Sequence, residues 1–425
     1  MSESSRARAA DWLGLNRATL AVLAVIGCLG LSEEVWSNFL SLHLKDLAAQ
    51  TNPTNAVVVA ALFTGVISSL KNLLEGFGYI IGGSVAHRMG PRMALAVSAI
   101  PNVIGFTIML LTGNPWVIVA GSLMMSNWEP LSVPATFDVV GSEVPKNRRT
   151  IAFAVQSIQK RVPKMIGPAI GAFILTAVGF WLNLVVALAL VGLAIVIQLA
   201  LTRHMRPKAE PARIPMREIM RTMPPDLRRL LQAEIFIRWG DWFARDFALL
   251  YIVSMLTTRY GWAEDSARHA GGWLMALMAT TALATYIPMA KWIDKAESPK
   301  PFIGVTFLLF SIFPISLVVL PRLSEAIGLP VMVGLALTFM LNGLRELGEP
   351  ARKALITTGF APEIRARAVG IYWGLRSFAF FPAPIVAALL WWKIGPEKTF
   401  LIGGAVGLVG TALFSIRGRD SFRGK

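Results

Sequence analysis

Repeated apolar segments, each about as long as a membrane-spanning helix, dominate this sequence of 425 residues. A run of roughly twenty residues rises about 30 Å as a helix, which is the thickness of the hydrocarbon core of a bilayer. Only 16% of the residues are charged, whereas about a quarter are charged in soluble globular domains. The pattern predicts an all-α integral membrane protein with 12 transmembrane helices, at 18–44, 57–85, 93–113, 116–142, 149–178, 181–202, 230–256, 270–293, 301–320, 330–358, 366–392 and 398–416.

A proline-rich, basic segment divides the predicted helices into two sets of six. It covers 203–229, which we expect to be a cytoplasmic linker, and separates an N-terminal bundle, 1–202, from a C-terminal bundle, 230–425. The two sets also match in sequence, because EEVWSNFLSL beginning at Glu33 aligns with DWFARDFALL beginning at Asp241. Such a repeat predicts two six-helix bundles related by a pseudo-twofold axis along the membrane normal, with a substrate site between them at mid-depth.

Lysine and arginine are distributed unevenly among the predicted loops. With the N-terminus inside, the cytoplasmic segments hold 25 of them and the outer loops hold 6. Because positive charge is retained on the cytoplasmic side, both termini are predicted to be cytoplasmic. We expect a multi-pass protein of the cell inner membrane, or of an intracellular organelle membrane derived from it. The same distribution accounts for most of the net charge of +16 without a nucleic-acid partner.

The loop between the second and third predicted helices carries a recognisable motif, GSVAHRMGPR from Gly83 to Arg92. Together with the spans and the repeat, it resembles the major facilitator superfamily of secondary transporters, whose loop has the form Gly-x-x-x-Asp-Arg-x-Gly-Arg-Arg. His87 stands where the family has aspartate, and the second half of the chain keeps that aspartate as Asp294. The resemblance implies a loop that braces a cytoplasmic gate, through Gly83, His87, Arg88, Gly90, Arg92, Asp294 and Lys295.

A weaker resemblance rests on the segments 33–36 and 238–242, which combine tryptophan with charged residues. They are similar to segments of the permeases of magnetosome membranes, and this resemblance implies iron as a substrate. Carboxylates alone would suit ferrous iron only moderately, because histidine and cysteine are absent nearby. Iron or another divalent metal is therefore an alternative substrate.

Charged residues inside the predicted spans are the sharpest indication of a functional site. The spans contain ten basic and ten acidic side chains, and one charge at the bilayer centre costs about 2.5–3.5 kcal/mol. These side chains must therefore face a polar interior, pair with one another, or both. The candidates for substrate binding or ion coupling are Glu33, Glu34, Glu129, Lys160, Arg161, Lys164, Arg238, Asp241, Arg245, Arg345, Glu346 and Arg376.

Helical spacing predicts which of these charges pair. Residues four apart lie on one helix face, and such pairs are Asp241 with Arg245, Lys71 with Glu75, and Arg345 with Glu349. The basic residues within 160–164 have no acid on their own helix, so they need partners from elsewhere or a bound anion. Glu234 is expected near the cytoplasmic end of its helix, reaching the membrane interface.

Motifs of soluble enzymes do not accompany these features. The sequence has no glycine-rich phosphate loop with lysine, and its single cysteine, Cys28, excludes a cysteine-rich metal site. We therefore expect neither an enzyme nor a bound cofactor or metal.

The expected function is secondary active transport of a small polar or charged solute by alternating access between the halves. Proton coupling would use a buried carboxylate such as Glu33, because burial disfavours the charged form and allows protonation during the cycle. A permease for iron or another divalent metal is one alternative, and a non-transporting membrane sensor or assembly factor is another.

Overall fold

The computed structural model describes residues 17–125, 130, 149–201, 216–296, 298, 300–358 and 365–418, and every regular element within them is helical. In the first half the elements are α2 (Arg17–Trp36), η1 (Ser37–Phe39), α3 (Leu40–Thr51), η2 (Pro53–Asn55), α4 (Ala56–Leu110), α5 (Pro115–Met125), α7 (Arg149–Ala177) and α8 (Phe180–Leu201). In the second half they are α9 (Met216–Thr222), α10 (Pro225–Trp242), α11 (Ala248–Tyr260), α12 (Glu264–Lys295), α13 (Lys300–Ala326), α14 (Val331–Leu344), α15 (Glu349–Thr358), α16 (Arg365–Phe380), α17 (Ala383–Ile394) and α18 (Pro396–Arg417).

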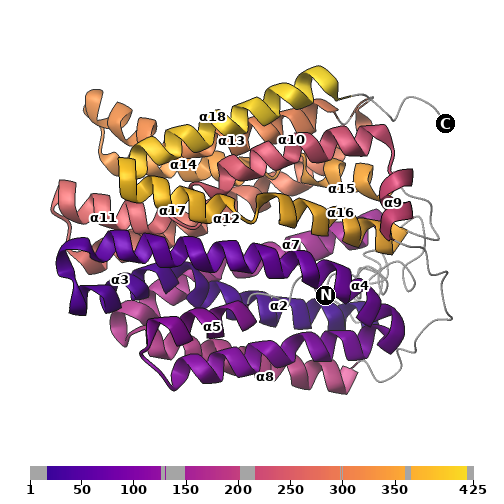
Figure 1. Ribbon diagram of the computed structural model, residues 1–425, viewed down its shortest axis with the longest axis horizontal. Helices are drawn as coiled ribbons and strands as arrows, with labels where there is room; N and C mark the ends of the chain where they lie inside the picture. The colour runs from indigo at the N-terminus through magenta and orange to yellow at the C-terminus, as the bar shows by residue number, and fades with distance from the viewer. Residues whose placement is uncertain are drawn as a thin grey trace, which may run out of the picture.

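Most of the long helices run side by side along the longest axis of the molecule (Figure 1). The helices α2, α3, α4, α5 and α8 pack together on one side, and α10, α13, α14 and α18 pack together on the other. Two seams join these sides, since α7 packs on α12 and α4 packs on α16 and α17. Of these seam helices, α4, α7, α12 and α16 contribute to the cavity described below.

Helix α4 is 55 residues long and reverses direction. The ring of Phe63, near its start, lies 5.0 Å from the ring of Trp116, which follows its end. A straight helix from residue 63 to residue 110 would be about 70 Å long, so this contact requires the chain to fold back. Figure 1 shows the bend at the end of the molecule that carries α9. The two arms correspond to the predicted spans 57–85 and 93–113.

Four predicted spans are interrupted near their middle, although the sequence suggested continuous helices. The span 18–44 divides into α2 and α3 around η1, 230–256 into α10 and α11, 330–358 into α14 and α15, and 366–392 into α16 and α17. Two causes are visible. The backbone N–H of Gly348, before α15, donates to the Oγ1 of Thr306 at 2.7 Å, and Pro382 has no N–H to continue α16.

Five of the described helices are long and apolar enough to cross a membrane, namely Pro53–Gly82, Phe180–Ala200, Lys300–Ala326, Arg367–Ile394 and Pro396–Arg417. Three shorter apolar helices accompany them, at Ala99–Leu110, Pro115–Met125 and Val331–Leu344. The predicted span 116–142 is described only to Met125 and at residue 130. The number of 12 spans therefore stays a prediction.

Candidate functional site

A cavity of about 390 Å³ lies between the two halves of the molecule. Its walls come from α2, η1, α3, α4, α5 and α7 of the first half and from elements between α10 and α16 of the second. The charged residues lining it are eight basic and six acidic: Glu33, Glu34, Lys71, Glu75, Arg161, Lys164, Arg238, Arg245, Asp246, Arg345, Glu346, Glu349, Arg352 and Arg376. These side chains therefore face a polar interior rather than lipid, which avoids the cost of placing charge in hydrocarbon.

Two neighbouring glutamates of α2 have different partners on the N-terminal side of the cavity. The ammonium group of Lys71, on α4, donates to Glu33 at 3.0 Å. Glu34 accepts a hydrogen bond of 2.9 Å from the amide of Asn38, and the ammonium group of Lys164 lies 4.0 Å from it. Glu33 is thus in a close ion pair, whereas Glu34 is held by a neutral donor and a more distant cation.

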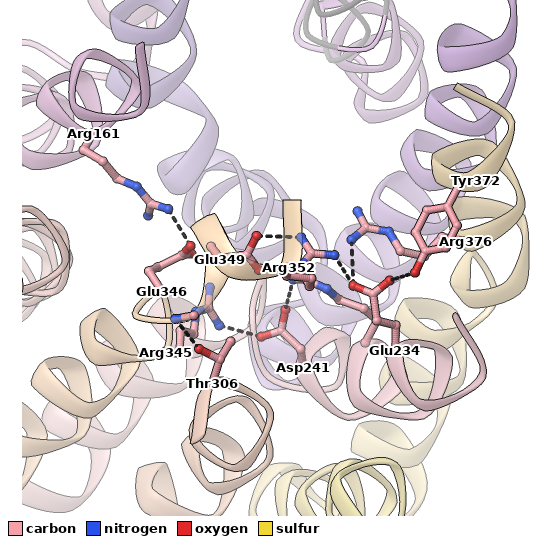
Figure 2. Close-up of polar contacts among 12 residues, drawn as sticks. Arg161, Glu234, Asp241, Thr306, Arg345, Glu346, Glu349, Arg352, Tyr372 and Arg376 are labelled. Atoms are coloured by element: carbon pink, nitrogen blue, oxygen red, sulfur yellow. Dashed lines mark hydrogen bonds and ion pairs between the residues drawn. The ribbon is translucent and has the colours of Figure 1, made fainter. Parts of the chain in front are cut away.

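An ion pair crosses the cavity from one half of the molecule to the other. The guanidinium of Arg161, on α7, lies 2.5 Å from the carboxylate of Glu346, in the turn between α14 and α15 (Figure 2). Arg161 and Lys164 thus have acidic partners outside their own helix, which is one of the two alternatives that the sequence left open for this basic cluster.

Seven side chains of the second half form a continuous series of alternating charges, which we call the charge chain. Figure 2 shows most of its ion pairs at the wall of the cavity. It begins and ends with arginine, and its members in order of contact are Arg345, Asp241, Arg238, Glu349, Arg352, Glu234 and Arg376.

The tightest contacts of the charge chain involve two arginines. Arg345 donates to Asp241 at 2.6 Å. Arg352 donates to Glu349 at 2.6 Å and also to Glu234. Charge-assisted hydrogen bonds of this kind are about twice as strong as neutral ones, so these contacts fix α10 against the turn between α14 and α15.

The other contacts of the charge chain are longer. Arg238 lies 3.4 Å from Asp241 and 3.6 Å from Glu349. Arg376, on α16, lies 3.7 Å from Glu234, which Arg352 also binds. Of the two arginines at the ends of the charge chain, Arg376 is therefore the more weakly bonded.

The prediction that Glu234 would reach the membrane interface is wrong. Glu234 is 1% exposed, because Arg352 neutralises one oxygen and the hydroxyl of Tyr372 donates to the other at 2.6 Å. Glu234, Arg238 and Asp241 are spaced by four and three residues, so they share one face of α10. That spacing was the available signal that Glu234 belongs with the candidate residues.

Sequence reasoning also left Arg352, Glu349 and Tyr372 outside the candidate site. Arg352 is 1% exposed and has two carboxylate partners, so it is the centre of the charge chain. The sequence marked Arg352 and Glu349 only as charges within a span, and Tyr372 carried no signal.

Two pairs predicted within helices are replaced by other contacts. The carboxylate of Asp241 is taken by Arg345 and Arg238, and the guanidinium of Arg245 instead lies 3.8 Å from Asp246 and over the ring of Trp242. The cause is the turn at residues 243–247, which ends α10.

Similarly, Arg345 and Glu349 are divided by the turn that precedes α15, and Glu349 binds Arg352. Lys71, whose predicted partner was Glu75, donates to Glu33 of α2 at 3.0 Å. For Asp241 with Arg245 and for Arg345 with Glu349, the ion pairs that form use residues other than the one predicted four positions away.

Several predicted site residues lie outside what the structure describes. Glu129 falls in a segment that is not described, and Lys160 is placed only by its backbone in α7. The residues of the gate motif are likewise placed by backbone alone, in α4 for Gly83, His87, Arg88, Gly90 and Arg92 and in α12 for Asp294 and Lys295. Among the residues whose side chains are described, no group of three or more His, Cys, Asp or Glu could hold a metal ion.

Comparison with known proteins identifies the family to which this helical membrane protein belongs. Residues 22–263, more than half of the chain, match the family described as Major Facilitator Superfamily. The chain belongs to the Major Facilitator Superfamily. It is therefore a multi-pass membrane protein of a transporter family and not an enzyme.

Relatives of this superfamily member include bacterial proteins named multidrug resistance protein MdtH. That of Sodalis glossinidius (strain morsitans) is 26% identical over 306 residues, covering 70% of this chain and 69% of the relative. That of Escherichia coli O9:H4 (strain HS) is 23% identical over 356 residues, covering 83% and 77%. These relatives do not support the weaker resemblance to magnetosome permeases.

Solved structures of transporters share the fold of this superfamily member. A POT family transporter in complex with 5-aminolevulinic acid aligns with a TM-score of 0.71 at 14% identity, covering 94% of this chain and 96% of that one. A D-xylose-proton symporter aligns with a TM-score of 0.69 at 14% identity, covering 96% and 99%. At such identities the likeness shows the fold alone.

Proposed function

We propose that the protein is a secondary transporter that moves a small polar or charged solute by alternating access, driven by protons. The observation that carries this proposal is the cavity between the halves, whose walls hold charged side chains from both. Its volume of about 390 Å³ lies within the usual range of small-molecule sites. A solute in this cavity would contact both halves, so its binding can be coupled to their relative movement.

The direction and location that we propose follow from the relatives and from the loop charges. The relatives are named multidrug resistance proteins, which favours export from the cell. The excess of lysine and arginine in one set of predicted loops favours cytoplasmic termini and an inner-membrane location.

Ion pairs between α3 and α12 support an alternating mechanism. Lys45 lies 2.5 Å from Glu264 of α12, and Arg268 of α12 lies 2.7 Å from Asp46. These four residues, which we call the latch, join the two halves at the end that the loop charges place outside. These pairs are partly exposed, and exposed ion pairs contribute about 0.2–1 kcal/mol each, which is weak enough to break in every cycle.

We propose Glu34 as the proton-binding carboxylate, in preference to Glu33. A nearby cation stabilises the ionised form of a carboxyl group and so opposes protonation. Glu33 has Lys71 at 3.0 Å, whereas Lys164 lies 4.0 Å from Glu34, whose hydrogen-bond donor is the neutral Asn38. Asp241 is the least suited of the three, because Arg345 and Arg238 both bind it.

Flux into proteoliposomes tests the proposal. The purified chain would be offered labelled organic anions, an organic cation, a sugar and ferrous iron, with and without an imposed pH gradient. Gradient-dependent accumulation of any one of them supports secondary transport and names the substrate class. If correctly folded protein moves none of them, the non-transporting sensor or assembly factor becomes the better account.

The glutamate assignment has a separate test in the same system. Glutamine resembles a permanently protonated glutamate, so Glu34→Gln should abolish accumulation driven by the pH gradient while exchange of solute across the membrane continues. The control is Glu325→Gln, since Glu325 pairs with Arg259 away from the cavity. Normal gradient-driven accumulation in Glu34→Gln would exclude Glu34 from proton coupling.

A further inference from the structure

We propose that the cavity binds its solute through an anionic group, such as a carboxylate, which is held by Arg376. This inference rests on the transport function proposed above and names the chemical class of the solute. Its basis is the charge chain, which has four arginines and three acids among the described residues and therefore carries a local excess of one positive charge. The other charged residues of the cavity lining are four basic and five acidic, so these residues and the charge chain together are balanced and the excess is confined to the charge chain.

The excess charge is deeply buried. Arg376 is 7% exposed and Arg345 is 8% exposed, and the members between them include Asp241 with no exposed surface. A buried charge without a partner is costly, because hydration is lost and nothing replaces it. Adding the neighbouring pair of Arg161 and Glu346 leaves the excess unchanged, since that pair is neutral.

Of the two ends of the charge chain, Arg376 is the one prepared for a ligand. Arg345 has a contact of 2.6 Å to Asp241, whereas the only ion pair of Arg376 within the described part of the chain is 3.7 Å long. Its Nε and Nη1 atoms are enclosed, with almost no exposed surface, and have no hydrogen-bond acceptor among the described residues. A guanidinium has five N–H donors in a planar fork that matches a carboxylate, so these donors suit an anionic group.

Aromatic rings hold Arg376 at the wall of the cavity. The Cζ of Arg376 lies 4.0 Å from the centroid of the Trp373 ring and 5.6 Å from that of Phe380, and all three residues line the cavity. Stacking fixes the plane of the guanidinium, and it leaves apolar ring surface beside the anion-binding edge. We therefore expect an anion attached to an apolar or aromatic body rather than a bare inorganic anion.

Binding to the purified full-length protein tests this inference independently of transport. Thermal unfolding in detergent would be measured with benzoate, benzyl alcohol and benzylammonium, which share a ring and differ in charge, at constant ionic strength. A ligand that binds only the folded state raises the unfolding temperature in a saturable way. Only benzoate should do so, and equal shifts from all three compounds, or none from benzoate, would overturn the proposal.

Two variants then locate the site. Arg376→Gln should weaken benzoate binding about 10-fold or more, as expected for loss of a charged hydrogen-bonding partner. Arg376→Lys keeps the charge without the planar fork and should bind at an intermediate level. Arg259→Gln, at a surface ion pair outside the cavity, should bind as the unmodified protein does. Unchanged affinity in both Arg376 variants would overturn the assignment, and the three-ligand comparison decides the question if neither variant folds.

A lipid phosphate is the other source of an anion for such a site. Phosphatidylglycerol added to the micelles at concentrations well below that of benzoate should leave benzoate binding unchanged. Displacement of benzoate at such concentrations would assign Arg376 to lipid and overturn the proposal. If benzoate binds but no solute is transported, the anion site is supported and the proposed transport function is overturned. If cations are transported and benzoate does not bind, the transport function is supported and the anion site is overturned.

Discussion

Arg345 and Asp241 lie 104 residues apart in the sequence, yet the guanidinium of one donates to the carboxylate of the other at 2.6 Å. Asp241 has no exposed surface, and Arg345 is 8% exposed. The contact ties α10 to the turn that divides α14 from α15. It therefore connects two of the places where a predicted continuous span is broken.

Replacing one partner of this pair should destabilise the fold more than replacing both. Asp241→Asn leaves the buried Arg345 without its carboxylate and leaves Arg238 with Glu349 alone, and breaking a buried ion pair typically costs about 3–5 kcal/mol. The double variant Asp241→Asn with Arg345→Met removes one of those charges and should recover part of that loss. Thermal unfolding of the purified proteins in detergent measures both.

The control for this prediction is Asp265→Asn, which makes the same replacement of aspartate by asparagine at an exposed position outside the cavity. It should unfold at the temperature of the unmodified protein. A double variant whose loss equals the sum of the two single losses would show that Asp241 and Arg345 act independently.

The existence of a charged, buried site could be predicted from the sequence, but the pairing within it could not. The excess cost of charge in hydrocarbon identified Glu33, Asp241 and Arg345 from their positions along apolar spans. Which charges meet depends on how each helix is rotated and crossed by its neighbours, and neither is encoded in local spacing. Asp241 and Arg245 have ideal spacing for a pair, but Asp241 binds Arg345, which is distant in the sequence, and Arg245 lies nearest to Asp246, the next residue.

The breaks in the spans were missed for a related reason. Hydropathy reports whether a segment is long and apolar enough to cross a bilayer, but it does not report the backbone within that segment. The turn before α15 depends on a hydrogen bond from Gly348 to Thr306, which is 42 residues away. Proline gave a local signal at Pro382 and at Pro350, which lies in the first turn of α15.

The ion pair between Arg161 and Glu346 should matter for transport through its charges rather than its shape. Arg161→Glu and Glu346→Arg each place like charges opposite one another, so each single variant should lose most of its flux in proteoliposomes. The exchanged double variant restores an attractive pair and should recover at least part of the flux. Recovery would demonstrate that the two halves interact through this pair during the cycle.

The matched control reverses a pair that does not join the halves. Arg259 and Glu325 both belong to the second half and lie 3.0 Å apart. Their charge reversals should leave flux close to that of the unmodified protein. If the exchanged variant of Arg161 and Glu346 stays as inactive as the single variants, although it folds, pairing alone does not explain their role.

Weakening the latch should open the cavity toward the outer side. Glu264→Gln removes the carboxylate that both Lys45 and Arg268 contact, and loss of such exposed pairs typically changes an equilibrium about two- to five-fold. Because Cys28 is the only cysteine, Ser41→Cys in a Cys28→Ser background provides a single reporter in the cavity wall. Labelling by a membrane-impermeant maleimide should be faster by that factor.

In the same background, Glu325→Gln is the control, since its ion pair does not join the halves. The cysteine at position 41 should be labelled in this control at the same rate as in the reporter protein with an intact latch. An unchanged rate in the Glu264→Gln variant would mean that the latch does not limit opening.

The latch should also respond to pH in a defined range. Burial alone would raise the pKa of Glu264, but hydrogen bonds and charge from Lys45 and Arg268 outweigh it and hold the pKa below its ordinary value of 4.5. The latch is therefore stabilised above pH 4.5, and this stabilisation is lost as the pH falls through the lowered pKa. The labelling ratio of Glu264→Gln to the unmodified protein should be constant from pH 7 to pH 5 and fall toward one in stronger acid. A ratio that already falls between pH 7 and pH 5 would assign the response to another group.

The seam between α7 and α12 should not tolerate a larger residue at Gly272. A Cβ on Gly272 would lie 2.7 Å from the Cβ of Ala172 and 3.1 Å from the carbonyl oxygen of Pro168, on the opposite half. Overpacking of this kind typically costs about 1–3 kcal/mol, so Gly272→Ala should lower the unfolding temperature. Gly192→Ala is the matched control, because that helical position has no atom within 4 Å of the new Cβ and alanine favours helix by about 0.5–1 kcal/mol. It should unfold at the same or a higher temperature, and equal effects of the two substitutions would show that close approach at Gly272 does not hold this seam together.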